Sequence, residues 1–364
     1  MKNLIAIFFI CSSCVALYIG AGFATMQEIF QYQGSYGSEF WIVILVEAII
    51  FTYTCVSFVV NSKRVTLMRG GDIYKVYCGR YIGKFFDYFA AFFCYMSFIV
   101  MCGGASSTVA QQWGIPSALG AIILAAIVVL TVVFGLDGIV DSLGVIAPII
   151  VVFIVVIASL SIANCSTGIS EGFAVTDSGK YPLIQVGNGN PVASGISEGG
   201  YVLLWFAVFL AELGSKNPKK TAVSGVLLSV FVIFGVCILV CVALNANIEA
   251  IWNSDVPALV LANAISPTLA FVFTIIIFFG IYTSAVPLLW TSVRKISKEK
   301  SIRYYVATIV LGILGCVVAC LVPYAPLMNV LYGVNGYLGF VLVAFMVVHD
   351  IRYVVKHRKL ANAL

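Results

Sequence analysis

Residues 4–32 read LIAIFFICSSCVALYIGAGFATMQEIFQY, and this stretch decides the fold. As a helix it is long enough to cross a hydrocarbon layer about 30 Å thick. Gly20 and Gly22 lie near its centre, with Gln27 and Glu28 shortly after them. A helix broken at mid-membrane exposes backbone groups that only a cavity or a ligand can satisfy, so we predict a break here that forms a binding site. The alternative interpretation is that the two glycines only permit close helix packing.

The composition places the whole chain in a membrane. Of its 364 residues, 62% are hydrophobic and 10% are charged, and the mean hydropathy is +1.09. A soluble domain is about 45–50% apolar and about 25% charged, so a soluble fold is excluded, and the alternation that a β-barrel needs is absent. We predict an all-α polytopic membrane protein with ten transmembrane helices. Their ranges are 4–32, 38–61, 84–109, 115–136, 139–163, 191–214, 218–246, 266–292, 303–322 and 325–349.

Lysine and arginine are distributed unevenly between these spans. If the N-terminus is cytoplasmic, Lys180 is the one basic residue of the 20 that falls outside. Short loops rich in Lys and Arg stay on the cytoplasmic side. We therefore predict a single transmembrane domain, 1–364, in the cell membrane, with both termini cytoplasmic and residues 350–364 as a cytoplasmic tail. The apolar run after Met1-Lys2 is also typical of a secretory signal peptide, which is the alternative for the first segment.

The spans divide into two sets of five, about 4–163 and 191–349. Since five is an odd number, the second set must be inverted relative to the first. Two inverted five-helix repeats form one architecture of secondary transporters, in which the substrate binds near mid-membrane where the first helix of each repeat is interrupted. The sequence therefore favours a transporter with a 5+5 inverted repeat.

The sixth span is the counterpart of the first. Its fully apolar stretch, 201–213, is too short to cross the membrane, and a glycine-rich segment, 195–200, precedes it. This pattern predicts that helix 6 is discontinuous as well. Tyr201 and Trp205 are candidate pocket side chains, although aromatic residues at this spacing are also typical of ordinary packing.

The eighth span contains Gly280-Ile281-Tyr282-Thr283-Ser284. Gly280, Thr283 and Ser284 share one helix face. If this face points at the broken first helix, two hydroxyl oxygens and a carbonyl supply hard oxygen ligands suited to a sodium ion. The alternative is that each hydroxyl bonds to a carbonyl of its own helix.

Several motifs resemble those of the YkvI-type bacterial membrane family. They are Gly20-Ala21-Gly22-Phe23-Ala24 with Gln27-Glu28, Met101-Cys102-Gly103-Gly104-Ala105, Gly135-Leu136 through Ala147-Pro148, and Tyr282-Thr283-Ser284-Ala285-Val286. That family is grouped with the amino-acid permeases of the amino acid, polyamine and organocation (APC) superfamily. The resemblance implies a LeuT-like fold.

The resemblance also implies where a coupling ion would bind. In sodium-coupled LeuT-like transporters, carbonyls at the end of the first half-helix and hydroxyls of the eighth helix hold the ion. By position, the ligands here are the carbonyls of Ala16 and Ile19 with Gly280, Thr283 and Ser284. Some sodium-independent relatives place a lysine of the fifth helix in this site, and 139–163 contains none, so sodium is favoured over protons. In two departures, Ser284 replaces the usual second Thr and Met26 stands where a Gly is common.

Glu28 and Glu47 are the deepest acidic residues, and no Lys or Arg lies deep in any span to neutralise them. Burial without a cation favours the neutral form of a carboxyl group. Both residues are therefore candidates for proton coupling, with Glu28 placed toward the outer vestibule. The alternative is a neutral acid hydrogen-bonded to a neighbouring helix.

These observations predict a secondary active transporter, not an enzyme, that carries a small neutral amino acid together with a cation by alternating access. A proton-coupled permease and a non-transporting amino-acid sensor of the same fold are the alternatives. The predicted substrate-binding residues are Ile19, Gly20, Ala21, Gly22, Phe23, Gly103, Gly104, Tyr201 and Trp205. No nucleophile with a base, metal cluster or polar stripe points to a lipid enzyme or a channel. We expect no cofactor besides sodium as coupling ion, and no nucleic-acid partner, only the substrate and the lipid bilayer.

Overall fold

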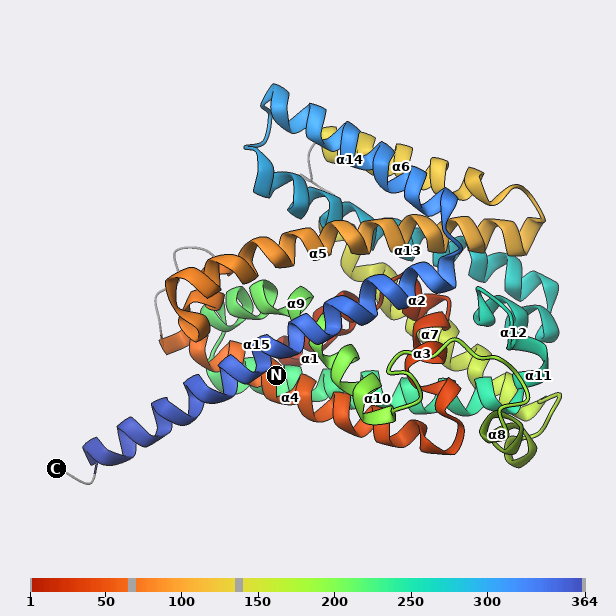
Figure 1. Ribbon diagram of the computed structural model, residues 1–364, viewed down its shortest axis with the longest axis horizontal. Helices are drawn as coiled ribbons and strands as arrows, with labels where there is room; N and C mark the ends of the chain where they lie inside the picture. Colours follow the sequence, from red (N-terminus) through yellow and green to blue (C-terminus); the bar gives the residue numbers. More distant parts are fainter. Residues whose placement is uncertain (1, 65–69, 135–139, 362–364) are drawn as a thin grey trace.

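The computed structural model describes residues 2–64, 70–134 and 140–361, and within these ranges the chain is all-helical (Figure 1). The motif residues Gly135-Leu136 lie outside the described residues. Eight helices of the described chain are long and apolar enough to span a membrane. They belong to α4 (Phe40–Arg64), α5 (Ile73–Trp113), α6 (Ser117–Phe134), α9 (Pro191–Lys216), α10 (Lys219–Ala246), α13 (Pro267–Ile296), α14 (Ile302–Leu321) and α15 (Tyr324–Ala361).

Two further apolar helices stand where the first and fifth spans are predicted. They are α1 (Lys2–Tyr18) and α7 (Val140–Ala163), whose apolar parts are Asn3–Tyr18 and Pro148–Ala163. The chain is therefore a multi-pass membrane protein by length and composition of its helices. The count of ten spans stays a prediction.

The first predicted span is broken, which confirms the break expected at its glycines. α1 ends at Tyr18, and Ile19 and Gly20 are not helical. The chain resumes as α2 (Ala21–Ala24), turns at Met26 and continues as α3 (Gln27–Tyr32). Met26 has φ +62°, in the left-handed region that favours glycine.

Helix 6 is not discontinuous, so this prediction is wrong. α9 runs without a break through the glycine-rich segment, and its interior keeps helical dihedral angles. It begins sharply because Pro191 occupies the first turn and the Asn190 side chain accepts hydrogen bonds from the N–H groups of Val192 and Ala193. The helix is 26 residues long and can cross the membrane in one piece.

The broken first span lies in the middle of the helix bundle. α1 packs against α10 and α7, and α2 packs against α5 and α13. α6 and α14 pack together along one edge of the bundle (top in Figure 1). Consequently every residue from Ala21 to Tyr32 is buried in protein, so the unwound backbone is shielded from lipid.

Short helices gather at the end of the bundle opposite the C-terminus (right in Figure 1). They are α8 (Ile169–Asp177), α11 (Ile248–Ile251) and α12 (Pro257–Ile265). Two short 3₁₀ helices, η1 (Gly34–Glu39) and η2 (Gly70–Asp72), complete the described secondary structure. The backbone of α12 is tied to the broken span, because the N–H of Ala258 donates to the carbonyl of Thr25 at 3.1 Å.

Candidate functional site

A cavity of about 360 Å³ lies directly against the break of the first span. Its wall comes from α1, α5, α7, α9 and α13, with Gly20 at the break itself. Ligand sites for small molecules are clefts of roughly 300–1,000 Å³, so the volume suits a small solute. The lining residues are Ser13, Ala16, Leu17, Ile19, Gly20, Cys94, Met101, Ile150, Trp205, Phe209, Gly280, Thr283, Ser284, Pro287, Leu288 and Thr291.

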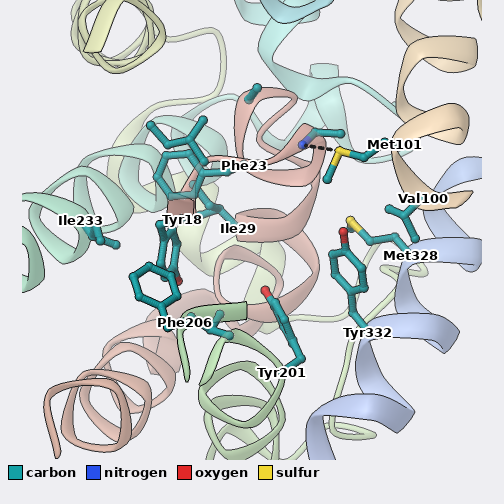
Figure 2. Close-up of a cluster of buried hydrophobic side chains, with 14 of the residues drawn as sticks. Tyr18, Phe23, Ile29, Val100, Met101, Tyr201, Phe206, Ile233, Met328 and Tyr332 are labelled. Atoms are coloured by element: carbon teal, nitrogen blue, oxygen red, sulfur yellow. Dashed lines mark hydrogen bonds between the residues drawn. The ribbon is translucent and has the colours of Figure 1, made fainter. Parts of the chain in front are cut away.

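The break leaves backbone groups without helical partners. The N–H of Ala21 donates to the Met101 sulfur at 3.3 Å, the contact drawn as a dashed line in Figure 2. Among the described residues, the N–H of Gly20 has no acceptor. The carbonyl of Ile19 accepts from the Ser284 hydroxyl at 3.3 Å. The cavity wall therefore offers one backbone donor and one backbone acceptor side by side.

All five predicted sodium ligands line this cavity: Ala16, Ile19, Gly280, Thr283 and Ser284. Their two hydroxyls behave differently. Thr283 bonds back to the carbonyl of Gly280 at 2.9 Å, within its own helix. Ser284 instead reaches across to Ile19 at the break, so one of the two hydroxyls joins α13 to the first span.

The predicted substrate residues divide into two groups. Ile19, Gly20 and Trp205 line the cavity. The other six are buried beside the break and are not part of the lining; they are Ala21, Gly22, Phe23, Gly103, Gly104 and Tyr201.

Packing explains where the second group lies. A Cβ on Gly103 would meet the Tyr324 ring at 3.2 Å, and one on Gly104 would meet the Ala21 Cβ at 2.9 Å. Phe23 packs edge-on against Tyr18, with ring centroids 5.6 Å apart. Gly103 and Gly104 therefore let α5 pack closely on α15 and on α2. Figure 2 shows Tyr18, Phe23 and Met101 around the broken span.

Gly22 makes room for a carboxyl group. A Cβ on Gly22 would lie 2.2 Å from Oε2 of Glu28, and Oε1 of Glu28 accepts from the Tyr201 hydroxyl at 2.5 Å. Tyr201 in turn stacks on Tyr332, with centroids 4.9 Å apart, and Figure 2 shows the two rings side by side. Glu28 is only 2% exposed, so in this conformation it is packed away and lines no vestibule.

A second carboxyl cluster joins four helical segments, namely α1, the end of α3, α4 and α9. Oε1 of Glu47 accepts from the Tyr18 hydroxyl. The side-chain N–H₂ of Gln33 donates both to Oε2 of Glu47 at 3.0 Å and to Oε2 of Glu198 at 3.1 Å. Glu47 is fully buried and Glu198 is 1% exposed. No ion pair with Lys, Arg or His involves Glu28, Glu47 or Glu198 within the ranges that the structure covers.

Glu198, Gln33 and Tyr18 were not predicted. Glu198 is as deep as Glu47, and the rule that an acid inside an apolar span has a function applies to it equally. The sequence did not reveal this because the glycines around Glu198 suggested the edge of a span. No group of three His, Cys, Asp or Glu residues able to hold a metal ion is found in 2–64, 70–134 and 140–361.

The two sides of the break differ. The cavity lies on the side of α1, where Ala16, Leu17, Thr283 and Ser284 are partly exposed. On the other side, α3 is buried throughout. There Thr25 lies within hydrogen-bond distance of Tyr324 at 3.2 Å, and the Gln31 side chain donates to the carbonyl of Ala325 at 3.0 Å. The site is therefore reached from one side and closed on the other.

Solved structures share the fold. No protein-family model matches the sequence, and no curated protein matches it. A point mutant of the manganese transporter of Eremococcus coleocola superimposes with a TM-score of 0.57 at 13% sequence identity, covering 94% of this chain and 78% of that one. The same transporter in complex with an aromatic bis-isothiourea substituted compound gives a TM-score of 0.56 at 14% identity with the same coverage.

The fold and the site together define a class. The chain has the fold of a multi-pass membrane transporter, with a cavity at a broken helix that is closed on one side. At this level of identity the likeness concerns the fold alone. Membership of the YkvI-type family stays a prediction.

Proposed function

We propose that this protein is a secondary active transporter of the cell membrane, in which a small neutral amino acid and a cation move together by alternating access. The observation that carries the proposal is the cavity at the break of the first span. It contains both an unpaired backbone donor at Gly20 and a set of oxygen atoms from α1 and α13. The backbone donor suits the carboxylate of a zwitterionic amino acid, and the oxygen atoms suit its ammonium group and a cation.

The helix contacts support an inverted repeat of five and five helices in a LeuT-like fold. When α1 to α3 count as one span, the first half is α1–α3, α4, α5, α6 and α7, and its counterparts in order are α9, α10, α13, α14 and α15. The contact of α1 with α10 then corresponds to that of α9 with α4, and the contact of α1 with α7 to that of α9 with α15. The contact of α5 with α6 likewise corresponds to that of α13 with α14. Exchanging the halves therefore preserves these contacts, as an inverted repeat requires.

The wall of the cavity favours a neutral substrate. Its lining contains no Lys, Arg, Asp, Glu or His among the described residues. The carboxylate of an amino acid would lie at the N–H of Gly20, and its side chain would rest against Trp205 and Phe209. A charged side chain would have no counter-charge there, and burying it unpaired is costly.

Sodium is our first choice for the coupling ion. The carbonyl of Ile19 and the hydroxyl of Ser284 already lie 3.3 Å apart, and Ala16, Gly280 and Thr283 add further oxygens to the same wall. An ion placed among them would replace the hydrogen bond between Ser284 and Ile19. In doing so it would connect the first span to α13.

Protons are the second candidate, because the Glu47 and Glu198 carboxyl groups share one amide donor. Two carboxylates this close, buried and without a cation, cannot both be ionised. We propose that the pair holds one proton between them, and that its release is the alternative coupling event. Glu47 lies in α4 and Glu198 in α9, so charge on the pair would push these helices apart.

Manganese, which the Eremococcus transporter carries by its name, is not our choice. Hard divalent ions prefer carboxylate, carbonyl and water oxygens, whereas this wall presents hydroxyls, carbonyls and the sulfur atoms of Cys94 and Met101. Manganese nevertheless belongs in the transport assay, as a direct alternative substrate.

We propose the orientation that the basic loops favour. With the N-terminus of α1 in the cytoplasm, the side of the break that holds Ser13 and Thr291 faces the cytoplasm. The structure then represents a conformation open to the inside, in which Glu28 and Tyr324 are covered on the outer side.

The test is uptake into proteoliposomes of radiolabelled neutral amino acids and of Mn²⁺, with a sodium gradient and a pH gradient imposed separately. We expect sodium-driven accumulation of an amino acid, which Thr283→Ala/Ser284→Ala should reduce. If the pH gradient alone drives uptake, Glu198→Gln should abolish that response. The exposed Glu212, which pairs with Lys216 at 3.6 Å, provides the control Glu212→Gln. Accumulation of Mn²⁺ without any amino acid would refute the proposal.

A further inference from the structure

A second hollow, of about 640 Å³, lies between the N-terminal part of α5 and the C-terminal end of α13. Five basic side chains line it, and they are Lys75, Arg80, Lys84, Arg294 and Lys295. Asp87 is its only acidic lining residue within the described chain, and Tyr88 completes the polar wall. The lining thus carries an excess of four positive charges, and it is separate from the transport cavity.

The sequence builds this hollow with two glycines. Gly79 interrupts α5 with φ +72°, a left-handed conformation that side chains other than glycine rarely adopt. The first turns of α5 then fold back onto the main helix at Gly83, where a Cβ would lie 2.6 Å from the Cα of Lys75. This close approach brings Lys75 to the same side as Lys84.

Some of the cations are already paired. Lys295 contacts Asp87 at 2.5 Å, Arg294 contacts Glu299 at 3.3 Å, and Lys75 contacts Asp72 at 2.6 Å. Arg80 and Lys84 have no acidic partner among the residues that the structure describes. Two exposed cations therefore face a hollow whose wall is positive, which favours an anion with several oxygens.

An aromatic stripe runs from this hollow along α5. Tyr81, Phe85, Tyr88 and Phe92 recur at helical spacing and are 84%, 55%, 52% and 53% exposed. Tyr88 belongs to both features, because it lines the hollow and the ammonium group of Lys295 lies 4.7 Å from the centroid of its ring. A ligand that fits both features has an anionic head and an apolar body.

We propose that this hollow binds the phosphate headgroup of an anionic phospholipid, whose acyl chains lie along the aromatic stripe of α5. Basic pockets between transmembrane helices at the cytoplasmic surface suit such headgroups, and the predicted orientation puts α5 and α13 in the inner leaflet at this end. The lipid would bridge two helices that both line the transport cavity. The proposal does not depend on which solute the cavity carries.

The experiment uses the purified full chain in a neutral detergent and follows its melting temperature during titration with phosphatidylglycerol. Phosphatidylcholine, with no net charge, and inorganic phosphate, with no acyl chains, are titrated in parallel. We expect a saturable rise with phosphatidylglycerol only. Equal rises with both lipids would refute an anion site, and a rise with phosphate at the same affinity would refute the lipid assignment.

Variants locate the site. Arg80→Gln/Lys84→Gln removes the two unpaired cations and should weaken the apparent affinity for phosphatidylglycerol about 30-fold, from the usual gain per basic residue near an anionic surface. Lys219→Gln/Lys220→Gln removes two exposed cations at the start of α10, outside the hollow, and should leave the affinity unchanged. All four side chains are exposed, so we expect both double variants to fold. The melting temperature of each variant without lipid checks this. If Arg80→Gln/Lys84→Gln melts well below the wild type, the single variants Arg80→Gln and Lys84→Gln are titrated instead. Wild-type affinity in Arg80→Gln/Lys84→Gln would overturn the proposal.

Discussion

The first span and α9 occupy matching places in the two halves of the chain, and both contain glycines in an apolar run. The first span breaks at Ile19 and Gly20, whereas α9 continues as one helix through Gly199 and Gly200. Glycine content alone therefore does not decide whether a membrane helix breaks. The two helices differ in the atoms that lie next to their glycines.

In α9, Gly195 and Gly200 face other backbones, whereas Gly199 packs on the side chain of Ile50. A Cβ on Gly200 would lie 1.9 Å from the carbonyl oxygen of Gly336, and one on Gly195 would lie 2.7 Å from that of Val43. In the first span the neighbours are side-chain atoms, namely Met101 beside Gly20 and Glu28 beside Gly22. Small residues let helices touch without breaking them, whereas at the break of the first span the Met101 sulfur accepts from the N–H of Ala21 in place of a helical carbonyl.

The largest effect that sharpens this comparison is expected for Gly200→Ala. The new methyl group would collide with the backbone of α15, which cannot rotate away, so α9 and α15 must separate. We expect a loss of about 3 kcal/mol or more in the free energy of unfolding, seen as a lower melting temperature in detergent. Gly235→Ala in α10 is the matched control, because no atom lies within 4 Å of its Cβ position. If Gly200→Ala melts with the wild type, α9 is not held by this contact.

The next effect concerns Gln33, which joins the end of α3 to Glu47 of α4 and Glu198 of α9. Gln33→Leu would leave both carboxyl groups without their shared donor in a buried site, at a cost of about 2–3 kcal/mol. Chemical or thermal unfolding in detergent measures this loss. Gln112→Leu, whose side chain contacts Asn263 at 3.3 Å at the exposed end of α5, should change stability by less than about 0.5 kcal/mol. Equal losses in both variants would contradict a special position for Gln33.

The sequence predicted the break because Gly20 and Gly22 stand next to Gln27 and Glu28, a polar group that no continuous lipid-facing helix would carry. It also placed Gly280, Thr283 and Ser284 on one face, and the structure puts all three at the cavity. Both predictions use local spacing, which a single helix already determines.

Other features depend on contacts between distant segments. The glycines of α9 suggested a break because their partners, Gly336 of α15 and Val43 of α4, cannot be read from α9 alone. The relation of Glu198 to Glu47 likewise exists only once Gln33 lies between them. Periodicity shows which side a residue faces, but not which helix it meets.

A smaller effect is expected for Gly22→Ala. Its methyl group would displace the Glu28 carboxyl group and break the hydrogen bond from Tyr201, both movable side chains, so we expect a loss of about 1–2 kcal/mol. The double variant Gly22→Ala/Glu28→Ala tests the cause, because removing the carboxyl group also removes the collision. The two losses should then be less than additive. Strict additivity would show that Gly22 is required for its backbone and not for Glu28.

The smallest effect on stability is expected for the hydroxyl groups of Thr283 and Ser284 in α13, which we expect to differ from each other. Ser284→Ala removes the bond to Ile19 across the break and should cost about 0.5–1 kcal/mol, whereas Thr283→Ala removes a bond within one helix and should cost less.

Sodium should increase the difference in stability between the wild type and Ser284→Ala if it binds where we propose. An ion that binds only the folded protein stabilises it in proportion to the logarithm of the ion concentration. The melting temperature of the wild type should therefore rise more in sodium chloride than in choline chloride. Ser284→Ala should lose most of that rise, since Ser284 is, within the described parts of the chain, the one residue of α13 whose side-chain oxygen bonds to the broken span. A sodium response that survives in Ser284→Ala and in the double variant with Thr283→Ala would place the ion away from the break.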